Sequence, residues 1–146
     1  MRVERVLVSA CLLGLRCRYD AIPLDPLRLP EGFCPIPLCP EQLGGLCTPR
    51  SPAQMVGGDG MAVLEGRARV VDQSGKDLTE AFLRGAEEVV RVARLLGIRR
   101  AFLKEKSPSC GVNYTHRDGE LVKGMGVTTA ALRRAGVEVM SEEELR

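Results

Sequence analysis

Thiols are the side chains of this sequence whose number and spacing point most directly to chemistry. The chain holds six cysteines in 146 residues. Three of them follow segments with the composition of a β-strand, namely Cys11 in "SAC", Cys39 in "CPE" and Cys110 in "SPSCG". Thiolates are soft ligands that bind zinc, copper(I) and iron–sulfur clusters. The set therefore predicts a metal centre or a reactive thiol.

The spacing of the cysteines does not match the usual zinc motifs. The sequence has no C-x-x-C pair, and His116 is its single histidine. An electron-transfer iron–sulfur cluster usually takes four thiolates, so three would leave one iron open, as a Lewis-acid catalyst requires. Zinc held by scattered cysteines and a plain role as small buried apolar residues stay open as alternatives. We assign no role to the remaining cysteines, Cys17, Cys34 and Cys47.

Polar residues accompany the thiols. Glu41 lies in the motif "CPE", Ser107 and Ser109 lie in "SPSCG", and Asp20 ends "CRYD". A carboxylate beside a metal centre and a substrate can act as a general base that activates water or a hydroxyl. Turn and cap roles are the alternative for the serines, and a solvated loop acid is the alternative for Glu41.

Composition limits the partners and the compartment that we expect. The net charge is +2, from 21 basic and 19 acidic residues, and the aromatic residues are three Phe, two Tyr and no Trp. The near balance of positive and negative charge, and the scarcity of aromatic side chains on which bases could stack, argue against a nucleic-acid partner. No apolar run has the length of a membrane helix, and "VLV" before "VSAC" is shorter than the roughly 7–15 apolar residues of a signal peptide. We expect a cytoplasmic protein, where unpaired cysteines more often bind metal or do chemistry.

The chain alternates segments typical of strands and helices. Val3–Ala10 has the pattern of a buried strand, Asp77–Leu96 has the 3.6-residue period of an amphipathic helix, and Arg99–Glu105 is the next strand. Asp77 is the expected helix cap and Gly97 the expected helix stop. The other expected elements are an extended segment from Phe33 into a turn at Cys39, a hairpin over Met61–Asp72 turning at Gly66, a hairpin over 112–123, a helix over 126–136, a strand over 137–140 and a last helical turn capped by Ser141.

These elements predict an α/β fold: a single domain over residues 1–146, with a mostly parallel sheet flanked by helices and a small hairpin insertion. In such sheets, ligands bind beyond the carboxyl ends of the strands. If the three strands that precede them are parallel neighbours, Cys11, Cys39 and Cys110 reach the same rim.

Five blocks of the sequence together resemble the bacterial thiouracil desulfidase family, long catalogued as a domain of unknown function. The resemblance runs from Val6 to about Glu143, and its blocks come in the order of the family. The blocks are "VSACLLGLRCRYD" (8–20), "CPEQLGGLCTPRSP" (39–52), "KDLTEAFLRGA" (76–86), "LKEKSPSCG" (103–111) and "GMGVTTAALRRAGVEV" (124–139).

The resemblance implies a cofactor and a reaction. Members of the family bind an oxygen-sensitive [4Fe-4S] cluster through three cysteines, which fall on Cys11, Cys39 and Cys110. The resemblance implies that the fourth iron is open and polarises the sulfur of a thiocarbonyl while water attacks the carbon. The expected outcome is hydrolytic conversion of thiouracil into uracil and sulfide, without net redox change.

The resemblance also implies roles for the polar residues near the thiols. Glu41 and Ser107 correspond to positions near the open iron that would assist proton transfer, and Ser109 and Asp20 are taken as further catalytic candidates. The expected partner is a small thiobase, with neither nucleic acid nor membrane, and the sequence does not predict the oligomeric state. Two alternatives from other classes remain: a zinc-stabilised binding module without catalysis, and a thiol-based sulfur carrier.

Overall fold

A four-stranded parallel sheet forms the centre of the molecule. The computed structural model describes residues 2–145, and in it the strand order is β2–β1–β5–β8 with every neighbouring pair parallel. The expected α/β class with a parallel sheet is confirmed. The strands are β1 (Glu4–Ser9), β2 (Phe33–Leu38), β5 (Arg100–Leu103) and β8 (Glu138–Ser141).

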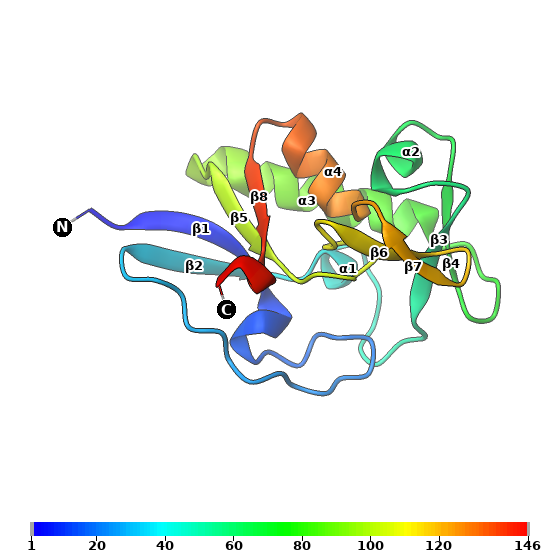
Figure 1. The fold of residues 1–146 in the computed structure, drawn as a ribbon, viewed down its shortest axis with the longest axis horizontal. Helices are drawn as coiled ribbons and strands as arrows, with labels where there is room; N and C mark the ends of the chain where they lie inside the picture. Colours follow the sequence, from blue (N-terminus) through cyan, green and yellow to red (C-terminus); the bar gives the residue numbers. More distant parts are fainter. Residues whose placement is uncertain (1, 146) are drawn as a thin grey trace.

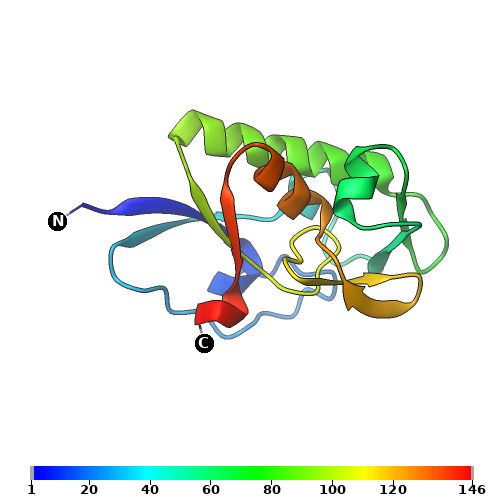
Figure 2. The same ribbon diagram turned by 45° about the horizontal axis from the view of Figure 1, so that its top comes forward.

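Helices cover one face of this sheet. The long helix α3 (Thr79–Leu96) and the shorter α4 (Val127–Arg134) lie side by side along it (Figures 1 and 2). The apolar stripe of α3 is buried, as its period predicts, and Gly97 ends the helix in the left-handed conformation. The core between these layers includes Leu7, Ala101, Leu103 and Val139 from the sheet and Phe82, Val89, Ala93 and Leu132 from the helices.

A long irregular segment covers the opposite face. The chain between the 3₁₀ turn η1 (Ala10–Leu13) and β2 contains no regular element and runs beneath the sheet (Figure 1). Its prolines prevent a regular helix, but its leucines still supply apolar surface. The central strands β1 and β5 are therefore buried on both faces, as continuous apolar runs in parallel sheets require, whereas the edge strand β2 is half-exposed. The second core contains Val6, Val8 and Phe102 from the sheet, with Leu12, Cys17, Leu24, Leu27 and Leu29 packed against them.

A second sheet is larger than the small hairpin that we expected. Its order is β4–β3–β6–β7. The predicted hairpin over 112–123 is confirmed as the antiparallel pair β6–β7. A single parallel register pair, Met55 with Arg117, joins it to the antiparallel pair β3–β4. The strands are β3 (Ala53–Val56), β4 (Arg69–Asp72), β6 (Tyr114–Arg117) and β7 (Glu120–Lys123).

The predicted hairpin over Met61–Asp72 is wrong. The first part of that segment is the helix α2 (Gly60–Leu64), and the second part is β4, which pairs with β3 instead. Asp59 explains the helix, because its carboxylate accepts hydrogen bonds from the Met61 and Ala62 N–H groups at 3.1 and 3.2 Å. The remaining short elements are α1 (Pro40–Leu43) and a final 3₁₀ turn, η2 (Glu142–Leu145).

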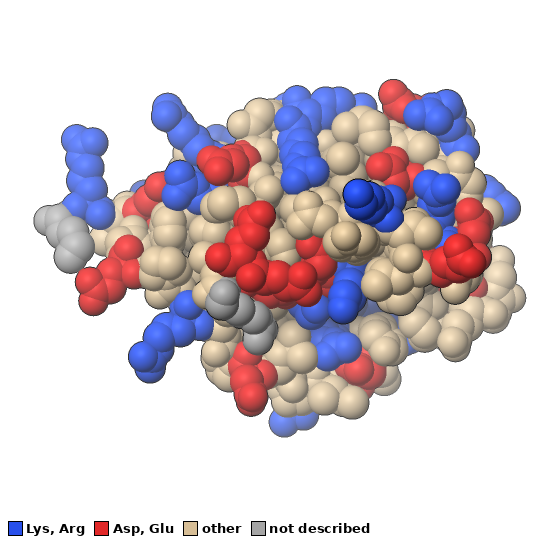
Figure 3. Space-filling model, viewed as in Figure 1, with Lys and Arg blue, Asp and Glu red and all other residues tan. Residues whose placement is uncertain are grey.

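The surface carries both signs of charge. On the face drawn in Figure 3, lysine, arginine and acidic side chains are interspersed, with acidic side chains gathered where Figure 1 places η2. This mixture agrees with the small net charge of +2. Within residues 2–145, no helix is both long and apolar enough to cross a membrane.

Candidate functional site

Thiols from separate parts of the sequence line one cavity. The cavity has a volume of about 530 Å³ and lies at the carboxyl ends of β1, β2 and β5. Because these strands are parallel neighbours, the turns that follow them meet at one edge, as the sequence predicted. Cys11 lies in η1, Cys39 directly precedes α1, and Cys110 lies in the loop after β5. Cys17 lines the same cavity.

Two glycines set the position of α1, and with it Cys39. A Cβ atom on Gly44 would lie 2.0 Å from the Ala81 carbonyl oxygen, and one on Gly85 would lie 2.0 Å from the Pro40 carbonyl oxygen. Only hydrogen at these positions lets the short helix rest directly on the backbone of α3. This close approach fixes the start of α1 at the edge of the cavity.

A buried carboxylate shapes the loop that carries Cys110. Glu105 is 1% exposed, and its Oε1 accepts hydrogen bonds from the Val112, Asn113 and Tyr114 N–H groups at 2.7, 2.8 and 3.0 Å. Burial alone raises the pKa of Glu105, but these backbone donors outweigh burial and the pKa lies below its ordinary value. An ionised Glu105 therefore folds the loop back toward β6.

The first turn of α4 holds the same loop from the other side. Val127 N–H donates to the Pro108 carbonyl at 2.9 Å, and Thr128 N–H donates to the Ser109 carbonyl at 2.9 Å. The Thr129 hydroxyl donates to the Cys110 carbonyl at 3.0 Å. The free N–H groups at this helix start are thus satisfied by the loop, and the position of the Cys110 thiol is fixed from both ends.

The cavity thiols interact with one another. A hydrogen bond with Cys11 raises the pKa of Cys17 to about 11. A hydrogen bond with Cys17, together with burial, raises the pKa of Cys39. Burial raises the pKa of Cys110 to about 12, and the charge of a nearby Cys39 thiolate adds to the effect. Several thiolates here would repel one another unless a positively charged group neutralised them.

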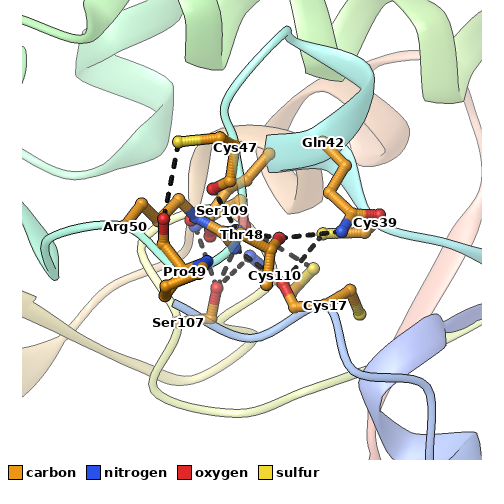
Figure 4. Close-up of polar contacts among 11 residues, drawn as sticks. Cys17, Cys39, Gln42, Cys47, Thr48, Pro49, Arg50, Ser107, Ser109 and Cys110 are labelled. Atoms are coloured by element: carbon orange, nitrogen blue, oxygen red, sulfur yellow. Dashed lines mark hydrogen bonds and ion pairs between the residues drawn. The ribbon is translucent and has the colours of Figure 1, made fainter. Parts of the chain in front are cut away.

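Figure 4 shows Cys17, Cys39 and Cys110 gathered beside the serines of the "SPSCG" loop. The remaining cysteines lie apart from them. Cys47 is exposed and its thiol donates to the Pro49 carbonyl at 3.4 Å, while Cys34 is exposed on β2. Of the six cysteines, only Cys11, Cys17, Cys39 and Cys110 line the cavity.

A chain of polar groups runs along the wall of the cavity. The Ser109 hydroxyl donates to Glu41 Oε2 at 2.8 Å, and the Ser107 and Ser109 hydroxyl oxygens are 3.0 Å apart. The other carboxylate oxygen, Oε1, accepts a hydrogen bond from Arg50 Nε at 3.0 Å. Since the Ser109 proton points to Glu41, the shared proton of the two serines comes from Ser107. Three of the sequence-predicted polar residues are therefore in contact.

Ser107 has little freedom as an acceptor. Its hydroxyl oxygen accepts the Ser109 N–H at 3.1 Å and the Cys110 N–H at 3.0 Å, so both of its lone pairs are used. What Ser107 retains is one O–H proton to donate, either to Ser109 or into the cavity that it lines. Ser107 therefore has the turn-capping role that the sequence allowed, and it also lines the cavity.

Asp20 lies outside this group. It does not line the cavity. Its carboxylate forms an ion pair with Arg18 at 3.5 Å and accepts the Ile22 N–H at 3.0 Å. These contacts shape the turn after the "CRYD" motif, and Arg18 and Tyr19 from that turn do line the cavity.

The donor set suits an iron–sulfur cluster better than a single ion. Within residues 2–145, no three His, Cys, Asp or Glu side chains converge closely enough to hold one metal ion. A [4Fe-4S] cluster makes a different demand, because each thiolate binds a separate iron and the sulfurs need not meet at one point. Four thiols line this cavity of about 530 Å³, so the residue types present are those that bind such a cluster.

Sequence reasoning missed three residues at this site. Cys17 was given no role, although it interacts with Cys11 and Cys39. Glu105 and Arg50 were not singled out, although Glu105 organises the Cys110 loop and Arg50 contacts Glu41. The available signals were weak: an acid between two lysines in "LKEK", and an arginine between prolines in "TPRSP".

Known proteins resemble this chain over nearly its whole length. The family model described as 2-thiouracil desulfurase matches residues 6–144. The uncharacterized protein YbbK of Bacillus subtilis (strain 168) is 41% identical, and the aligned region covers 96% of this chain and 97% of YbbK. The solved structure of the [4Fe-4S]-dependent thiouracil desulfidase TudS (DUF523Vcz) has 39% identity and a TM-score of 0.81, covering 97% of this chain and 93% of that one. The chain therefore belongs to the 2-thiouracil desulfurase family.

Proposed function

We propose that this protein is a [4Fe-4S]-dependent desulfidase that converts a thiouracil into the corresponding uracil and sulfide. The observation that carries the proposal is the convergence of Cys11, Cys39 and Cys110 on one cavity beside Glu41, Ser107 and Ser109. Family membership and the likeness to TudS support the same conclusion. The substrate is a small thiobase, and the cavity volume of about 530 Å³ leaves room for both a cluster and such a ring.

Cys11, Cys39 and Cys110 are the residues that would hold the cluster. Each follows a different strand of the parallel sheet, so rigid elements position all three. When bound, the cluster supplies an iron without a protein ligand, a soft Lewis acid that favours the sulfur of a thiocarbonyl over the oxygen of a carbonyl. This preference also favours substrate over product.

Ser107, Ser109 and Glu41 form the polar wall of the cavity and transfer the protons of the proposed reaction. Ser107 presents a donor, because its acceptor positions are filled by backbone N–H groups. Ser109 accepts from Ser107 and donates to Glu41. Transfer of the Ser107 proton to Ser109, and of the Ser109 proton to Glu41, gives a continuous path from Ser107 to a carboxylate, and Glu41 acts as the general base at its end. The proposed reaction consumes one water and produces uracil and hydrogen sulfide, with no electrons left over.

Turnover under anaerobic conditions tests this function. The protein is reconstituted with iron and sulfide without air and is then incubated with 2-thiouracil, while uracil and sulfide are quantified. We expect equal amounts of the two products, many per chain, with no external reductant. A protein that carries its cluster and leaves 2-thiouracil unchanged would contradict the proposal, as would a colourless protein that takes up zinc in place of iron.

A further inference from the structure

Arg50 joins separate loops of the cavity wall. Its side chain is 9% exposed, and all three of its nitrogens are engaged. Nε donates to Glu41 Oε1 at 3.0 Å, and Nη2 donates to the Cys17 carbonyl at 2.9 Å. Nη1 donates to the Thr48 hydroxyl at 2.9 Å and to the Cys47 carbonyl at 3.2 Å. Figure 4 shows this arginine next to the loop of residues 47–49.

These contacts hold the Arg50 guanidinium in a single orientation. It is planar and donates in fixed directions, and here each nitrogen has a different partner. Two backbone carbonyls and one hydroxyl hold the group, so Nε is presented to Glu41 by the fold. The guanidinium is therefore placed independently of the carboxylate that it binds.

The carboxylate depends on this placement. Glu41 rotates about its own side-chain bonds, and its two oxygens have one protein partner each: Arg50 for Oε1 and the Ser109 hydroxyl for Oε2. Without Arg50, Oε1 loses its donor and the carboxylate is free to turn away from Ser109. The proton path from Ser107 to Glu41 would then be interrupted.

We propose that Arg50 is a positioning residue that fixes the Glu41 carboxylate on the Ser109 hydroxyl and thereby keeps the serine–carboxylate path intact. The inference rests on the proposed desulfidase function for its kinetic consequence. Its structural consequence, an ordered "SPSCG" loop, is independent of that function, because the Ser109 and Cys110 N–H groups donate to Ser107 within the same network.

Kinetics of single and double variants test the inference in the reconstituted protein. We expect Arg50→Gln to lower kcat for 2-thiouracil at least tenfold, with KM and iron content close to wild type. Arg50→Lys should recover part of kcat, because an ammonium can still reach Glu41. In a Glu41→Gln background, adding Arg50→Gln should change kcat less than twofold, because the arginine acts through that carboxylate. Losses that multiply in the double variant would overturn the proposal.

Arg84→Gln is the matched control. Arg84 also donates to a backbone carbonyl beside α1, that of Gly44, at 2.8 Å, but it does not line the cavity. Its replacement should leave kcat within twofold of wild type. A tenfold loss in Arg84→Gln would show that any damage near α1 has the effect assigned to Arg50, and would also overturn the proposal.

Hydrogen–deuterium exchange provides the readout that does not need turnover. We expect Arg50→Gln and Glu41→Gln to speed exchange of the Ser109 and Cys110 amides to a similar degree, with no further increase in the double variant. Unchanged exchange in Arg50→Gln would contradict the positioning role. If the wild-type protein carries a cluster and fails to desulfurise 2-thiouracil, the proposed function is wrong, while this exchange pattern still decides the role of Arg50.

Discussion

Ser109 is the residue on which the polar wall of the cavity depends most. It is 2% exposed, and its hydroxyl stands between the Ser107 hydroxyl and Glu41. The hydroxyl also lies 3.7 Å from the Cys110 sulfur. The Ser109 hydroxyl oxygen thus contacts the Glu41 carboxylate, the Ser107 hydroxyl and the thiol of Cys110, which is one of the proposed cluster ligands.

Replacing Ser109 with alanine should therefore slow the reaction without emptying the site. We expect Ser109→Ala to lower kcat for 2-thiouracil by about 100-fold, the lower range for the loss of proton transfer. Iron per chain should remain at the wild-type level, because the Cys110 loop keeps its bonds to Glu105 and α4. Steady-state kinetics with iron analysis of the same samples is the measurement. Ser74→Ala, in an exposed turn, is the control, and equal kcat values for the two variants would remove Ser109 from the mechanism.

Residue types and their neighbours allowed part of the site to be predicted. Cys11, Cys39 and Cys110 were selected because each follows a strand, and Glu41 and Ser107 because they are short-range neighbours of those thiols. Cys17 and Arg50 could not be found in this way. Both lie in irregular segments that follow no strand pattern, and their contacts at the cavity arise only from the path of those segments in space.

At the scale of elements, Glu105 holds the end of β5 and the start of β6 together. Its bonds to the Val112, Asn113 and Tyr114 N–H groups enclose the loop that carries Cys110. These donors keep its pKa below the ordinary value of 4.5. An ionised Glu105 therefore stabilises the folded state above that pH, and the stabilisation is lost as the pH falls through the folded-state pKa.

Glu105→Gln should remove this pH dependence. We expect the variant to lower the free energy of unfolding at pH 7 by about 1–3 kcal/mol, the usual cost of weakening buried hydrogen bonds to a charged group. The gap between wild type and variant should shrink as the pH falls below the ordinary value of 4.5 and through the folded-state pKa of Glu105. Urea unfolding of both proteins across this range is the measurement, with exposed Glu87→Gln as the control. A gap that stays constant with pH would show that the charge of Glu105 has no part in holding the loop.

The elements themselves were predictable where periodicity is strong. The α3 stripe, the β6–β7 hairpin and the parallel strands β1 and β5 are confirmed. The segment from Met61 was misread because Gly66 suggested a hairpin turn, whereas the Asp59 cap starts a short helix before it. The second sheet was underestimated for a similar reason, since the pairing of β3 with β6 joins segments distant in the sequence.

At the scale of the whole molecule, the fold acts as a frame that brings three strand ends to one edge. The order β2–β1–β5 places Cys11, Cys39 and Cys110, the proposed cluster ligands, in the turns and loop that follow adjacent strands. Helices pack on one face of the sheet and the irregular segment packs on the other, each with its own apolar core. The expected class of fold was predictable from the sequence because it depends on connection rules, whereas the shape of the cavity depends on loop paths that those rules leave open.

Iron and sulfide content tests the central claim, that Cys11, Cys39 and Cys110 hold one cluster, most directly. After anaerobic reconstitution, wild type should contain about four irons and four acid-labile sulfides per chain. Cys11→Ala, Cys39→Ala and Cys110→Ala should each lose most of both, while Cys17→Ala and Cys47→Ala should keep them. Full iron content in any of the first three variants, or its loss in either of the last two, would contradict the account.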